Sequence, residues 1–195
     1  ASVTPAEAQQ QPKPSSQQRL HAFSILIHQS LDLETTAYAV VNELRSMLGC
    51  DRVTLALAQR SGCRLMAISG QDTIDRRADN VRQLETLAEK AMCLNAPLWC
   101  DRETSNWKES IEKLGRLKDE ASVDSPWTLL GMLPLRPSPN ETAIGVLIVE
   151  RMTAAASADV LQRRAKVLIP HVTQAMLNAR TYSHLSLLPL WSTLG

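Results

Sequence analysis

Two long apolar runs in the second half of the chain constrain its fold most. AIGVLIV, residues 143–149, carries no charge, and it follows a second apolar run, Trp127–Leu135. The segment between them, residues 136–142, contains two prolines and an asparagine. Two such runs joined by turn residues predict antiparallel strands with a loop between them. Both runs are apolar on both faces, so each strand must be covered above and below.

The bulk properties of the chain set limits on its function. Its 195 residues predict one domain with a core large enough to need no disulfides. The formal net charge of +1 provides no basic field for nucleic acid, and the aromatic content of 4% argues against a stacking platform for bases. No apolar run reaches the ~18–20 residues of a membrane span, and no signal pattern is present, so we expect a cytoplasmic protein.

The chain is expected to divide into three parts. Residues 1–17 are rich in Gln, Pro and Ser, which predicts a disordered lead-in. Residues 18–185 form a single domain with flanking helices. Residues 186–195 form an apolar tail that can lead to a membrane segment outside this chain.

Apolar spacing and turn residues predict the order of helices and strands. Expected helices are Gln18–Gln29, Glu34–Leu48, Asp79–Leu94, Asn106–Ser122 and Ser157–His184. Besides the two runs above, expected strands are Asp51–Arg60, Cys63–Gly70 and Ala96–Cys100. This order predicts an α+β domain with a mostly antiparallel sheet, terminal helices on one face and middle helices on the other. Asp32 is the expected N-cap of the second helix, and Gly49 is expected to end it.

Three segments in this order resemble a GAF domain, a small-molecule sensing module of signalling proteins. They are Leu31–Gln59, the strand CRLMAISG (residues 63–70) and Leu129–Arg151. The resemblance implies a central antiparallel sheet of about five strands, in which the last strand lies beside the first. It also implies a regulatory domain of a larger bacterial signalling or membrane-transport protein.

The sequence departs from two branches of that family. It lacks the Asn-Lys-Phe-Asp-Glu signature of members that bind cyclic nucleotides. No cysteine precedes a histidine, which argues against a covalent bilin, and we expect no cofactor. The helical lead-in and the tail LSLLPLWSTLG also resemble the cytoplasmic GAF part of bacterial membrane-fusion-type secretion adaptors. That resemblance implies a membrane-spanning helix after the end of this chain.

The family's lid over its pocket would correspond to Asn106–Ser122. An unidentified small-molecule ligand would then lie between this lid, the helix around Leu84 and the sheet. The candidate pocket residues are Met66, Ile68, Leu84, Leu87, Trp107, Ile111, Leu130 and Met132. The alternative is that these side chains fill the space and no ligand binds.

Enzyme signatures are largely missing, and we expect a non-enzymatic protein. Neither phosphate-binding glycine motif occurs, and there is no G-x-S-x-G or H-E-x-x-H. The four histidines fall on the terminal helices, and no metal site is expected. Cys50, Cys63, Cys93 and Cys100 are interpreted as reduced structural thiols. The alternative is a cysteine-dependent reductase of free methionine sulfoxide, as in some relatives of this fold, with Cys93 and Cys100 meeting across a helix-to-strand junction.

The terminal helices carry the clearest signal for a partner. A heptad stripe runs along the last helix, and a short apolar stripe runs along the first. Pairing of both helices about a two-fold axis would form a homodimer. The candidate interface residues are Leu20, Phe23, Ile27, Leu168, Val172, Met176, Ala179 and Tyr182. The alternative is that both helices pack within one monomer.

Overall fold

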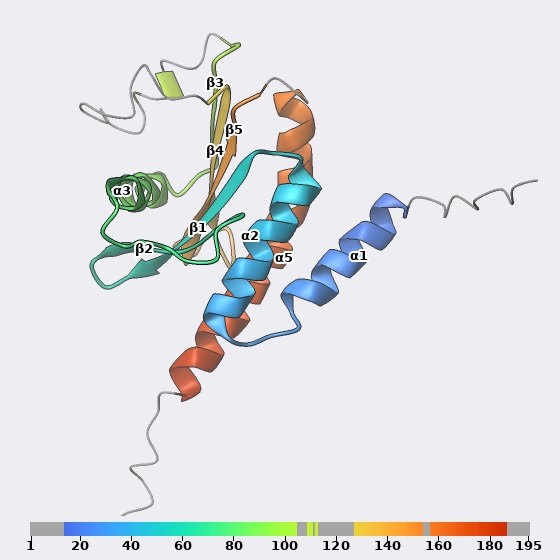
Figure 1. Cartoon of the computed structure of the whole chain (residues 1–195), viewed down its shortest axis with the longest axis vertical. Helices are drawn as coiled ribbons and strands as arrows, with labels where there is room; N and C mark the ends of the chain where they lie inside the picture. Colours follow the sequence, from blue (N-terminus) through green and yellow to red (C-terminus); the bar gives the residue numbers. More distant parts are fainter. Residues whose placement is uncertain (1–13, 105–108, 111, 113–126, 154–156, 187–195) are drawn as a thin grey trace, which may run out of the picture.

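A computed structural model describes residues 14–104, 109–110, 112, 127–153 and 157–186. Its elements lie in the predicted order, with a central sheet between helical layers (Figure 1). They are α1 (Ser16–Ile27), α2 (Leu33–Leu48), β1 (Arg52–Gln59), β2 (Gly62–Ile68), α3 (Asp79–Leu94), β3 (Leu98–Asp101), β4 (Leu129–Leu135), β5 (Gly145–Arg151) and α5 (Ala158–Ser186). Most of the predicted helix Asn106–Ser122 lies outside the described residues.

The five strands form one antiparallel sheet in the order β2-β1-β5-β4-β3. β5 is the central strand, and it pairs with β1 on one side and β4 on the other. Every residue of β4 and β5 is buried, because both strands have neighbours on each side and helices above and below. The predicted α+β class, and the prediction that the last strand lies beside the first, are confirmed.

Helices cover both faces of the sheet, as predicted. α2 and α5 pack side by side on one face, and α3 covers the other (Figure 1). α1 contacts α2 and α5, so it forms an additional layer outside them. The buried side chains form two cores, one beneath α2 and α5 and one beneath α3. Each buried leucine-sized side chain contributes about 1.5–3 kcal/mol, so both cores hold the sheet in place.

A β-bulge in β2 interrupts the alternation of its side chains. Leu55 of β1 opposes Ala67, whereas the next residue, Ala56, opposes Leu65, so Met66 is the extra residue. Leu65 therefore belongs to the α3 core, while Met66 packs against the core beneath α2 and α5. A bulge of this kind reverses the face of every residue on one side of it.

The ends of α2 follow the expected capping chemistry. The Asp32 carboxylate accepts a hydrogen bond of 2.8 Å from the Thr35 N–H, and Gly49 ends the helix with a left-handed φ of 70°. The Arg164 guanidinium on α5 donates to the Leu48 carbonyl over 3.2 Å. This cation lies where the helix dipole is negative, so it ties α5 to the end of α2.

α5 continues through Pro170 without a break in the helix assignment. A proline has no N–H, so the carbonyl four residues earlier receives no helical hydrogen bond there.

Within the described residues, no helix combines the length and the apolar character needed to cross a bilayer.

Candidate functional site

The α3 face of the sheet brings together most of the predicted pocket residues that the structure describes. Ile68, Leu84, Leu87, Leu130 and Met132 are all buried in the core between the sheet and α3. The inclusion of Met66 was wrong, because the bulge in β2 turns it to the opposite face. Trp107 and Ile111 lie outside the described residues.

Thr54 is the buried polar side chain of this face that lacks a partner. Its cross-strand neighbours are Ile68 on β2 and Ile148 on β5, both in the α3 core. Its chain neighbours Val53 and Leu55 belong to the other core, so the Thr54 hydroxyl faces α3. Thr54 is 0% exposed, and its Oγ1 forms no hydrogen bond with any described residue. A buried hydroxyl of this kind needs an explanation, because leaving it unpaired costs about 1–3 kcal/mol.

A charged pair lies beside Thr54 on the same face. The Arg52 guanidinium donates twice to the Glu150 carboxylate, once through Nε to Oε2 and once through Nη2 to Oε1. This bidentate hydrogen bonding raises the pKa of Arg52, and partial burial opposes the rise. The Glu150 side chain is fully buried, and that of Arg52 is 28% exposed. The pair thus places a charged group at the outer end of an apolar face.

Cys100 lies in the same row of cross-strand neighbours as Glu150. Glu150 is opposite Leu130, and Leu130 is opposite Cys100 on β3. Burial raises the pKa of the Cys100 thiol to about 11, and a side-chain hydrogen bond with Ser110 opposes the rise. Ser110 is itself buried, which places this part of the predicted lid segment over β3. The chain therefore covers the α3 face with residues from both α3 and the segment after β3.

All four cysteines are unpaired. Burial also raises the pKa of Cys50 to about 12 and that of Cys63 to about 11. These two thiols and Cys100 are therefore protonated, and poor nucleophiles, near neutral pH. Cys93 is exposed on α3, whereas Cys100 is fully buried in β3, so the two do not form the accessible pair that a reductase needs. Among the described residues, no three His, Cys, Asp or Glu side chains gather to hold a metal ion.

The predicted interface residues of the terminal helices are mostly buried within a single chain. This holds for Phe23, Ile27, Leu168, Val172, Met176 and Ala179, while Leu20 is half-buried and Tyr182 is 51% exposed. Met176 and Ala179, near the end of α5, are fully buried by the helices of their own chain. α1 packs against both α2 and α5 and belongs to the same core. A partner chain would have to contact the residues that remain exposed.

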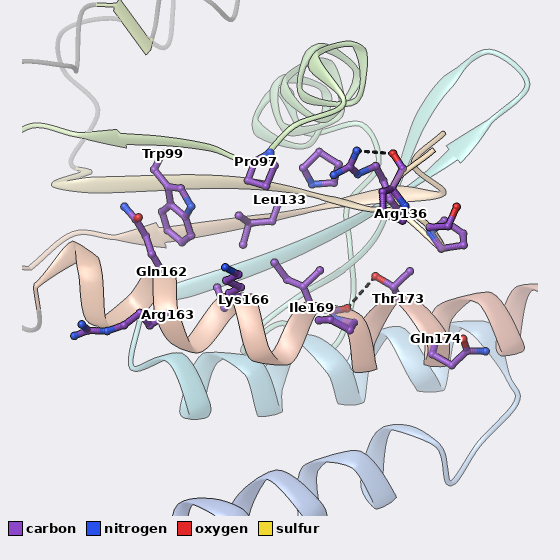
Figure 2. Close-up of a pocket in the computed structure, with 16 residues that line it drawn as sticks. Pro97, Trp99, Leu133, Arg136, Gln162, Arg163, Lys166, Ile169, Thr173 and Gln174 are labelled. Carbon is purple, nitrogen blue, oxygen red and sulfur yellow. Dashed lines mark hydrogen bonds between the residues drawn. The ribbon is translucent and has the colours of Figure 1, made fainter. Parts of the chain in front are cut away.

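Sequence reasoning missed a groove on the other face of the sheet. It lies between α5 and the β3–β4 side of the sheet, and its volume is about 710 Å³ (Figure 2). We call it the α5 groove. Trp99, Leu133, Pro134 and residues 136–139 line its sheet side, and Gln162, Lys166 and Ile169 line its helix side. The residues come from three separate segments with no shared motif, so no sequence pattern could have identified it.

Comparison with known proteins identifies the fold. No family model and no curated sequence matches this chain. The GAF domain of a phosphoenolpyruvate-protein phosphotransferase from Acinetobacter is 14% identical, with a TM-score of 0.61 over 86% of this chain and 97% of that one. The GAF domain of a putative sensor histidine kinase from Pseudomonas syringae pv. tomato is 16% identical, with a TM-score of 0.54 over 86% and 89%.

An enzyme has a similar structure. The free methionine-R-sulfoxide reductase from Neisseria meningitidis is 13% identical, with a TM-score of 0.57 over 85% of this chain and 90% of that one. Sensory domains and an enzyme thus share this architecture, and likeness at such identities does not separate the two functions. The α+β architecture of this chain is a GAF-like fold.

Proposed function

We propose that this chain is a non-enzymatic regulatory domain that binds a small molecule between the sheet and α3. The orphaned Thr54 hydroxyl supports this most directly. It is enclosed by apolar side chains on the α3 face, and a hydroxyl can both donate and accept a hydrogen bond. Pockets for small molecules combine an apolar lining with a few polar groups of this kind.

The ligand would be predominantly apolar and carry one polar group for Thr54. Ile68, Leu130 and Ile148 provide the apolar surroundings. Arg52 and Glu150 already satisfy each other, so they do not offer a free charge to a phosphate. The chain also lacks a phosphate-binding glycine motif, so we expect no nucleotide to bind tighter than about 1 μM.

A thermal-shift screen of small metabolites tests the proposal, with Thr54→Val as the diagnostic variant. Valine keeps the shape of the side chain and loses no existing hydrogen bond, so the variant is expected to be at least as stable as the parent. Thr54→Val should also abolish the rise in melting temperature that a ligand causes in the parent protein.

The matched control is Thr36→Val, which removes a 3.0 Å hydrogen bond to the Ser30 carbonyl. This control should lower stability by about 1 kcal/mol and leave ligand binding intact. A ligand that binds both variants and the parent equally would contradict the role of Thr54.

The alternative function is reduction of free methionine sulfoxide, which the Neisseria protein with this fold is named for. The buried, protonated Cys63 and Cys100 thiols argue against it. Turnover of free methionine sulfoxide with a thiol reductant would support it, provided that a cysteine substitution abolishes that turnover. We expect no turnover above the buffer rate.

The proposed domain also forms a homodimer through its terminal helices. Apolar side chains remain exposed on α1, on the link to α2 and on α5, and they are Ile25, Leu31, Val167, Tyr182 and Leu185. In Figure 1 the link between α1 and α2 and the C-terminal end of α5 lie at the lower end of the molecule. Contact between two copies there would join the long helices of the two subunits. A ligand that moves the sheet could then alter the spacing of those helices.

The setting that we propose is the cytoplasmic part of a larger bacterial signalling or membrane-transport protein. Four unpaired thiols fit a reducing compartment. The resemblance to a secretion adaptor stays a prediction. A run of ~20 apolar residues after Gly195 in the full-length protein would support it.

A further inference from the structure

The α5 groove combines an apolar base with a cationic rim. Figure 2 shows Trp99 and Leu133 pointing from the sheet toward α5, where Gln162, Lys166 and Ile169 lie along the helix. Trp99, Leu133 and Ile169 pack against the core beneath α2 and α5, so they provide a fixed apolar surface. The volume of about 710 Å³ falls within the range of pockets for small organic molecules.

The charges around the groove are all of one sign. Arg136, Arg163 and Lys166 line it, and none of the described lining residues is acidic. Within the described part of the chain, the side chains of Arg163 and Lys166 form no hydrogen bond or ion pair. The two cations are three residues apart on one helix, and like charges at this spacing destabilise a helix. A bound anion would relieve this repulsion.

The backbone around the groove favours recognition by side chains. Five lining residues are prolines, which lack an N–H and have a restricted backbone: Pro97, Pro134, Pro137, Pro139 and Pro170. A phosphate is usually held by several backbone N–H groups at a helix start or in a glycine-rich loop. The proline-rich walls of this groove provide few such donors. A carboxylate is satisfied by one or two cationic side chains, which the rim provides.

We propose that the α5 groove is a second ligand site, for small organic acids that combine an apolar body with a carboxylate. The apolar body lies against Trp99, Leu133 and Ile169, and the carboxylate meets Lys166 and Arg163. The site lies on the opposite face from Thr54, so it is independent of the ligand proposed for the α3 face. Its ligand touches both the sheet and α5, and its binding would therefore link the position of α5 to the sheet.

Titration with three naphthalene compounds tests the proposal. 2-Naphthoate carries the carboxylate, 2-naphthamide is its neutral counterpart, and 2-naphthyl phosphate replaces the carboxylate by a phosphate ester. We expect saturable binding of the naphthoate that weakens as salt is raised, and at least about tenfold weaker binding of the amide. No saturable binding of the naphthoate below about 1 mM would overturn the proposal, and so would equal affinities for naphthoate and amide. Tighter binding of the phosphate ester would overturn the carboxylate class.

Charge-removing variants locate the binding. Lys166→Met and Arg163→Met keep an apolar stem and remove one cation each, so each should weaken the naphthoate about fivefold or more and leave the amide unchanged. Arg82→Met makes the same charge change on the exposed side of α3 and should leave the affinity unchanged. Equal affinity in all three variants and the parent would overturn the site. Loss of naphthoate binding in Thr54→Val but not in Lys166→Met would show that the acid binds on the α3 face instead.

Discussion

The indole ring of Trp99 occupies the space that a side chain at Gly131 would need. The two residues are cross-strand neighbours on β3 and β4, and a Cβ at position 131 would come within 2.4 Å of the ring atom Cζ3 of Trp99. A glycine in a strand interior often marks such a close approach. Gly131 therefore allows Trp99 to lie over the sheet and form one wall of the α5 groove.

Gly131→Ala is expected to destabilise the domain by about 1–3 kcal/mol, because the indole ring must move away from the new methyl group. Urea unfolding of the parent and the variant measures the difference. In a Trp99→Ala background the space is empty, and the same substitution should cost less than about 0.5 kcal/mol. Equal costs in the two backgrounds would contradict the contact.

The fold could be predicted from the sequence because its central strands are so strongly apolar. Residues 143–149 have no charge and follow turn residues, which is typical of a strand inside a sheet covered on both faces. Helix ends were predictable where a capping residue is present, as at Asp32 and Gly49. A local signal was overlooked at the start of α1, where Ser15 and Gln18 form a capping box.

The candidate sites were predicted less well, for physical reasons. The bulge that turns Met66 away from α3 depends on pairing with β1, which no local pattern encodes. Heptad spacing on α5 shows an apolar face but does not distinguish burial by α1 or α2 from burial by another chain. The α5 groove arises where separate segments meet around Trp99 and Lys166.

Removing Arg52 should cost much more stability than removing one partner of a surface ion pair. Arg52→Met leaves the buried Glu150 carboxylate without its partner, so we expect a loss of about 3 kcal/mol. The exposed pair of Asp79 and Arg82, at 3.7 Å, is the control, and Arg82→Met should cost less than about 0.5 kcal/mol. Chemical unfolding at matched salt measures both losses. Similar losses for the two variants would show that water screens the Arg52 pair.

The buried thiols should make the domain lose stability at alkaline pH. A thiol in the unfolded chain ionises near its ordinary pKa of 9.0, whereas burial raises the pKa of Cys63 and Cys100 to about 11. Above pH 9 the native state therefore binds more protons than the unfolded state, and the free energy of unfolding falls as the pH rises toward 11. Below pH 9 the thiols stay protonated in both the native and the unfolded state, so they do not lower the free energy of unfolding there. Urea titrations at several pH values measure the slope.

Cysteine variants show which thiol causes the fall in the free energy of unfolding at alkaline pH. Cys100→Ala should give a flatter decline than the parent between pH 9 and about 11, because one buried thiol no longer ionises on unfolding. Cys93→Ala changes an exposed thiol and is the control. If the decline is the same in both variants, ionisation of Cys100 does not cause it.

The proposed dimer should depend on exposed side chains of the terminal helices. Tyr182→Asp and Leu185→Asp are expected to convert a dimer to a monomer in light scattering at tens of micromolar, without unfolding the domain. Phe23→Asp should instead unfold the domain, because Phe23 is buried in the core. Leu94→Asp alters an exposed leucine on α3 and serves as the control. A monomeric parent protein at these concentrations would refute the dimer.

Methyl NMR can detect directly whether a small molecule binds on the α3 face. Each core contributes reporter methyl groups, such as Ile68 and Ile148 beneath α3 and Leu55 and Val172 beneath α2 and α5. Metabolite pools are added to the labelled domain, and the shifts of the two sets are compared. We expect at least one compound to shift the Ile68 and Ile148 signals saturably, with smaller changes at Leu55 and Val172. Thr54→Val should remove the response. A complete metabolite set that leaves the Ile68 and Ile148 signals in place would contradict it.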